Sequence, residues 1–168
     1  LADADLADAN LARAYLAGAN LAGANLAGAY LARAYLADAN LAGANLAGTN
    51  LARAYLADAD LDAANLAGAY LARAYLSGSN LRDGLKLIGN RPVFQIGPIG
   101  SRQDFFTAYI TNNGLRFDAG CQRQITRDQF EQRLADTHGD NEHAREYRAA
   151  LALIDLHAEL WTPKEGAA

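Results

Sequence analysis

The sequence predicts a mainly β fold, in which a four-sided helix of stacked coils is capped by a small α+β domain. Leu recurs at every fifth residue from Leu1 to Leu81 without a gap. Three residues after each of these leucines stands a small residue, usually Ala. The period fails at Lys86, where Leu is due, and the composition then changes. We therefore expect two domains, a repeat domain over residues 1–85 and a capping domain over residues 86–168.

The five-residue period excludes an amphipathic α-helix. On an α-helix, successive leucines would turn by about 140° and would be distributed on all sides. Such a helix would have no apolar stripe to bury. Gly, Asn and Asp also recur at fixed offsets from Leu, and these residues favour turns over helices.

A square coil accounts for the period. If each five-residue unit forms one side, its Leu points inward at the middle of the side and its small residue points inward at the corner. The other three positions face solvent. Coils then stack through backbone hydrogen bonds at about 4.8 Å, and each buries its surface against its neighbours.

The repeated unit resembles that of a known family. The run Ala19–Gly23 is similar to the A(D/N)LXX repeat of pentapeptide repeat proteins, and it recurs in register through the first half of the chain. The resemblance implies a right-handed quadrilateral β-helix with four repeats per coil. Tyr often replaces the usual Asn or Asp before Leu, but that position points outward, so we expect the core to tolerate it.

Two surface columns are the candidate binding residues. Their members are twenty residues apart, which is one predicted coil: Arg13, Arg33, Arg53, Arg73, Tyr15, Tyr35, Tyr55 and Tyr75. Structurally, stacked Tyr rings would cover the coil, Arg stems would lie along them, and Asp38 and Asp58 would screen the Arg charges. Functionally, the columns would bind an anionic or flat partner surface. Repeat duplication alone can produce such columns, so the structural interpretation is preferred at this stage.

The charge pattern narrows the classes of function. The net charge is −4, and we expect no direct binding of nucleic acid, which requires a basic stripe. Some pentapeptide repeat proteins resemble DNA and bind type II topoisomerases, but residues 1–85 carry eight Asp against five Arg, only a small acidic excess. We predict a non-catalytic scaffold or protein-interaction module. A DNA-mimicking topoisomerase regulator is one alternative, and an uncharacterised activity of the C-terminal domain is another.

The second half must cover an open end of the coil, which would otherwise expose leucines and unpaired backbone groups. A strand is expected over 93–96, and a hairpin over 105–111 and 115–117 around Asn112-Asn113-Gly114. Thr126 and Gln129 predict a capping box and a helix to about residue 137. Gly139-Asp140 ends it, and a second helix follows over 141–161. One face of this helix carries Tyr147, Leu151, Ile154 and Trp161.

This half is similar to C-terminal domains attached to pentapeptide repeats in phage and bacterial proteins. The likeness lies in residues 95–102 and 137–143. Those domains have no established activity, so this resemblance implies a fold and no function.

No catalytic residues, cofactor or metal are predicted, and we expect a protein that is not an enzyme. Residues 97–102 lack the Walker lysine spacing, and Pro98 lacks an N–H group, so a turn is expected there. His138, Glu142 and His143 do not form a recognised ligand frame and are expected to cap helices. Cys121 is expected to be a buried structural thiol.

The sequence leaves the protein partner unidentified. A single Cys cannot form an internal disulfide, and no membrane span or signal segment is present, so we predict a cytoplasmic protein without membrane contact. The chain begins in repeat register at Leu1, which suggests that a natural N-terminus has been lost. Pairing of open coil ends would then give a homo-oligomer.

Overall fold

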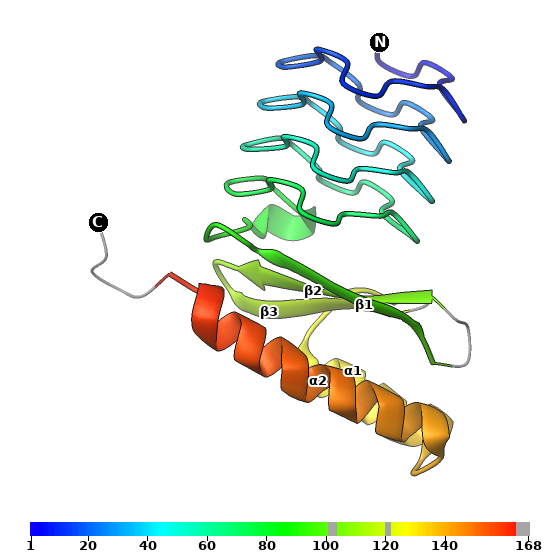
Figure 1. Ribbon diagram of the computed structural model, residues 1–168, viewed down its shortest axis with the longest axis vertical. Helices are drawn as coiled ribbons and strands as arrows, with labels where there is room; N and C mark the ends of the chain where they lie inside the picture. The colour runs from blue at the N-terminus through cyan, green and yellow to red at the C-terminus, as the bar shows by residue number, and fades with distance from the viewer. Residues whose placement is uncertain (101–103, 120–121, 164–168) are drawn as a thin grey trace.

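The computed structural model describes residues 1–100, 104–119 and 122–163, apart from the side chain of Gln122. Stacked coils form a column that stands on a β-sheet, and helices cover the far side of that sheet (Figure 1). The predicted β-helix followed by an α+β region is confirmed at this level. Among the described residues, no helix combines the length and the apolarity needed to cross a bilayer.

The coils are held together by backbone pairing between residues twenty positions apart. Parallel bridges run from Asp5↔Asn25 through to Asp60↔Asn80. Within each repeat, the N–H of the small residue donates to the C=O of the preceding Leu, as from Ala24 to Leu21 at 3.1 Å. Between them lies a residue with positive φ, such as Gly23 at 67°. This is the geometry of a type II turn, and it explains why Gly recurs at this offset.

The leucines fill the interior of the coils, as predicted. From Leu21 to Leu61, every repeat Leu is at most 1% exposed, so each contributes about 2 kcal/mol of burial. The two polar variants of the small residue are also buried and paired. The Thr49 hydroxyl donates to the Leu26 carbonyl at 3.0 Å, and the Ser79 hydroxyl to the Leu56 carbonyl at 2.6 Å. The interior of the coils is therefore apolar, and the hydroxyl groups of Thr49 and Ser79 within it are hydrogen-bonded.

A short 3-10 turn, η1 (Arg82–Gly84), leads out of the coils into an antiparallel sheet. In the described residues its order is β1 (Val93–Ile99), β2 (Asp104–Thr111), β3 (Gly114–Ala119) and β4 (Gln122–Ile125). The predicted hairpin at Asn112-Asn113-Gly114 joins β2 to β3. The turn expected over 97–102 is partly wrong, because β1 continues through a bulge to Ile99; residues 101–103 lie outside the described residues.

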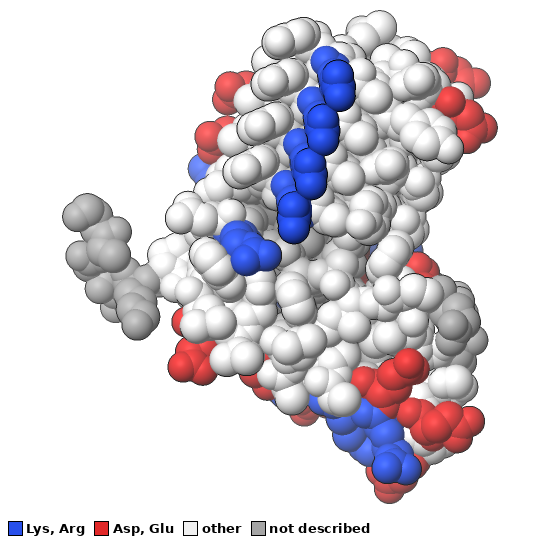
Figure 2. All heavy atoms as spheres, in the orientation of Figure 1, with Lys and Arg blue, Asp and Glu red and all other residues white. Residues whose placement is uncertain are grey.

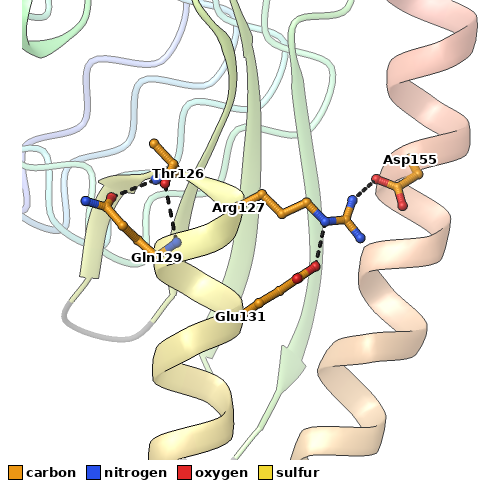
Figure 3. Close-up of polar contacts among 5 residues, drawn as sticks. All are labelled: Thr126, Arg127, Gln129, Glu131 and Asp155. Carbon is orange, nitrogen blue, oxygen red and sulfur yellow. Dashed lines mark hydrogen bonds and ion pairs between the residues drawn. The ribbon is translucent and has the colours of Figure 1, made fainter.

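Two helices follow the sheet in the described chain, α1 (Arg127–His138) and α2 (Glu142–Trp161). Figure 3 shows the predicted capping box, in which Thr126 and Gln129 satisfy each other's backbone N–H groups. Arg127 then joins the helices, because its guanidinium contacts Glu131 of α1 at 2.6 Å and also Asp155 of α2. The predicted face of α2 is confirmed for three residues, since Tyr147, Leu151 and Ile154 are buried.

Strand β2 is buried on both faces and joins the two parts of the molecule. Phe106 and Ala108 pack in the cluster formed with the helices. Tyr109, on the other face, belongs to the same buried cluster as the leucines of the coils. The sheet thus covers the C-terminal end of the β-helix, as the sequence predicted.

Gln95 of β1 completes the backbone pairing of the last coil. Its side chain accepts a hydrogen bond from the Leu71 N–H at 2.8 Å and donates to the Ala69 C=O at 2.9 Å. It also donates to the Thr107 hydroxyl at 3.2 Å. One amide side chain therefore supplies a donor and an acceptor where a further coil would otherwise supply them.

Candidate functional site: the Arg–Tyr face

The Tyr column consists of Tyr15, Tyr35, Tyr55 and Tyr75, which are joined in turn by backbone bridges. Because the coils are in register, the rings stack with centroids 4.7, 5.0 and 4.9 Å apart and planes within 3° of parallel. Such pairs contribute about 0.5–1.5 kcal/mol each beyond burial. The inner rings, Tyr35 and Tyr55, are 39% and 40% exposed and present mainly their edges. The column is therefore a stiff ridge along the β-helix.

The Arg column consists of Arg13, Arg33, Arg53 and Arg73, all exposed. Each occupies the positive-φ position of its repeat, with φ of 62°, 60°, 59° and 58°. A residue with a Cβ is strained there by about 1 kcal/mol or more, whereas Gly is not. Other repeats place Gly or Asp at this position, and one places Ala63 there. Four Arg residues in one column are therefore held at a conformational cost.

An open groove of about 550 Å³ runs between the two columns, lined by Arg13, Tyr15, Arg33, Tyr35, Arg53 and Tyr55. Figure 2 shows the basic column as a continuous line down the β-helix, with acidic side chains toward the edges of the view. The groove thus has guanidinium groups on one wall and Tyr edges on the other.

The acidic neighbours expected to screen the Arg column make no direct contact with it in the described residues. Among the described residues, no ion pair, side-chain hydrogen bond or cation–ring contact includes a member of this column. Asp58 instead pairs with Lys86 at 3.8 Å. Neighbouring guanidinium groups about 5 Å apart in water repel by under about 1 kcal/mol. The column therefore adds repulsion to backbone strain, and no ion pair within the described chain offsets that repulsion.

The other candidate residues do not assemble a site. The rings of His138 and His143 lie 5.6 Å apart, across the break between α1 and α2. The described residues contain no group of three or more His, Cys, Asp or Glu side chains placed to hold a metal ion. Cys121 and Arg102 lie outside the described residues. The Gly100 N–H donates to the Glu146 carboxylate at 2.7 Å.

Sequence reasoning missed one buried polar pair. The Tyr109 hydroxyl donates to Asp118 Oδ2 at 2.9 Å, and the Gln124 N–H donates to Asp118 Oδ1 at 2.6 Å. Burial raises the pKa of both Tyr109 and Asp118, although the Gln124 hydrogen bond and the charges of Arg123 and Arg82 oppose the shift at Asp118. No local motif marks such a pair, because it depends on the register between β2 and β3.

The family model of pentapeptide repeats matches this sequence in eight copies, over residues 1–36, 34–69 and 54–83. Residues 1–83 belong to the pentapeptide repeat family. The resemblance found in the sequence is thereby confirmed, and the structure adds the α+β region that follows the repeats.

Solved pentapeptide repeat proteins are similar to about half of this chain. HetL from Nostoc, described as involved in the regulation of heterocyst differentiation, is 39% identical; the match covers 48% of this chain and 41% of HetL, with a TM-score of 0.29. Rfr23 from Cyanothece is 36% identical over 48% of this chain and 51% of its own, with a TM-score of 0.37. This chain thus spans about half the length of each. No curated protein matches it.

Proposed function

We propose that this pentapeptide repeat protein is a non-catalytic protein-interaction module, in which a rigid β-helical rod holds the Arg–Tyr face against an acidic surface of a protein partner. One observation carries the proposal. The Arg column occupies positive-φ positions, and nothing in the described chain pairs with its charges. Residues in sparsely populated backbone conformations cluster at active sites and ligand-binding sites, where the surrounding structure holds them in place.

The chemistry of the face favours carboxylates as its ligands. Guanidinium groups donate paired hydrogen bonds that match the geometry of a carboxylate. Proteins that bind single-stranded nucleic acid stack bases on aromatic rings. Here the rings of Tyr35 and Tyr55 are covered on both faces by their neighbours in the column, and the net charge is −4. The exposed Arg column also argues against mimicry of DNA, because a DNA mimic needs a continuous acidic surface.

The rod that presents this face is, in our proposal, a right-handed, four-sided β-helix over residues 1–85, with a cap over residues 86–168. Bridges between residues twenty positions apart support four repeats per coil. Backbone hydrogen bonds link each coil to the next. In the last coil, the Gln95 side chain of the cap pairs with the Leu71 N–H and the Ala69 C=O. A cytoplasmic location and the absence of catalysis belong to the same proposal.

The test is a pull-down from cell lysate with the intact protein and with the double variant Arg33→Glu/Arg53→Glu. The matched control is Arg133→Glu/Arg145→Glu, which makes the same charge change at exposed positions of α1 and α2. We expect a protein captured by the intact chain to be lost with the Arg33/Arg53 variant and kept with the control. Identical captured proteins in all three samples would contradict the proposal.

A further inference from the structure

The Arg–Tyr face continues around the coil into an acidic column. Successive exposed or half-buried residues along one coil are Arg33, Tyr35, Ala37 and Asp38, while Ala34 and Leu36 between them are buried. The next coil repeats this order with Arg53, Tyr55, Ala57 and Asp58. The Tyr column therefore has a basic column on one side and a pair of acidic residues on the other.

The relief of this surface alternates in the same order. The groove lies between the Arg and Tyr columns. The Tyr column projects as a ridge, and Ala37 and Ala57 on its far side carry only methyl groups. Between the Tyr column and the acidic pair, the surface of these two coils therefore carries no side chain larger than a methyl group.

We propose that a second copy of this chain binds this surface, so that the carboxylates of its Asp38 and Asp58 enter the groove beside Arg33 and Arg53. The inference rests on the proposed function, since it names the acidic partner of the same face. The Tyr ridge of each copy would lie against Ala37 and Ala57 of the other. Both copies would contribute the same residues, as in an isologous two-fold interface.

Charge selects the direction of the two-fold axis. A two-fold axis parallel to the stacking direction places the Arg side of one copy opposite the Asp side of the other. It also keeps corresponding coils of the two copies at the same height. Arg33 then meets Asp38 of the second copy, and Arg53 meets Asp58. An axis across the stacking direction would instead place the Arg columns opposite each other, where their charges repel. The two rods should therefore lie side by side and parallel.

The interface is small and charged, so it should be weak. Four coils at about 4.8 Å spacing give a face about 19 Å tall, which is small for the roughly 800 Å² that each partner buries in a stable complex. Asp58 must also exchange its contact with Lys86, which lies 3.8 Å away. Salt screens exposed pairs of this kind. Association should therefore appear at high protein concentration and weaken as salt is added.

Charge reversal tests the pairing. The variant Arg33→Asp/Arg53→Asp makes the middle of the face acidic, and Asp38→Arg/Asp58→Arg makes it basic. Both should fold, because the native repeats already place both Asp and Arg at this positive-φ position. Circular dichroism checks that they do. The matched control, Asp3→Arg/Asp8→Arg, makes the same substitution at positive-φ positions on other sides of the coil.

The measurement is mass by sedimentation equilibrium over a wide concentration range. We expect the native chain and the control to rise above the monomer mass of 17.8 kDa toward twice that value. Each face variant alone should stay monomeric, and an equimolar mixture of the two should form a heterodimer. A native chain that stays monomeric throughout, or a mixture that does not associate, overturns the inference. The pull-down has a different protein as its readout, so it can still succeed or fail by itself.

Discussion

Each pentapeptide places its third residue, counted from Leu, at positive φ, and this residue sets the local stability of the β-helix. Gly occupies the position without strain, Asp tolerates it, and residues with larger side chains are strained. Ala63, with φ of 53°, stands where Gly23 and Gly43 stand in the two preceding coils. The offset of Gly was visible in the sequence, but the strain at Arg and Ala was not, because only the backbone shows that they share the same φ.

Ala63→Gly should raise the free energy of unfolding by about 1 kcal/mol, because Gly relieves the strain at positive φ. Gly43→Ala, one coil away in the same column, should lower it by a similar amount. A Cβ at Gly43 would meet no atom within 4 Å, so that loss would come from φ alone. Urea unfolding measures both changes. Two changes of the same sign would contradict this account of the turn.

Asp118 should make stability depend on pH. Its pKa in the folded protein lies above the ordinary 3.8 because of burial, so the folded state binds the proton more tightly. The stability that protonated Asp118 contributes is full below pH 3.8, and it is lost as the pH rises through the pKa of the folded state. The unfolding free energy of the native chain minus that of Asp118→Asn should therefore fall as pH rises from 3.8 and then level off. Urea unfolding across this range measures the difference, and a rise would contradict it.

At the scale of elements, local signals predicted most of the cap. The Asn112-Asn113-Gly114 turn and the Thr126–Gln129 capping box each depend on a few adjacent residues, and both were confirmed. The role of Gln95 was not predictable, because its partners Leu71 and Ala69 lie 24 and 26 residues away among the repeats. The same holds for Arg127 and Asp155, which come together only when α1 and α2 pack.

Removal of the Gln95 amide should loosen the junction between rod and cap. Gln95→Leu keeps the size of the side chain but leaves the Leu71 N–H and the Ala69 C=O without their partner. Each unsatisfied group costs about 1–3 kcal/mol, so we expect a loss of roughly 2–4 kcal/mol in unfolding free energy. Gln132→Leu, at an exposed position of α1, is the control and should change little. Equal effects would show that the junction does not depend on Gln95.

At the scale of the molecule, the repeat period determines most of the architecture. Leucines at every fifth residue predicted a coil with an apolar interior, and the twenty-residue spacing of Arg and Tyr predicted columns that stack. The order of columns around the coil also follows from the sequence. The sequence did not predict the contacts of these columns. Nothing in it showed that Asp58 pairs with Lys86 and that the Arg column has no acidic partner in the described residues.

The central claim is that the Arg column is held at a conformational cost because it binds. The double variant Arg33→Gly/Arg53→Gly tests it most directly, through urea unfolding and sedimentation of the same samples. Relief of strain at two positive-φ positions predicts a gain of about 2 kcal/mol in unfolding free energy, together with loss of association. A variant that is less stable than the native chain, or that associates as well as it does, would contradict the claim.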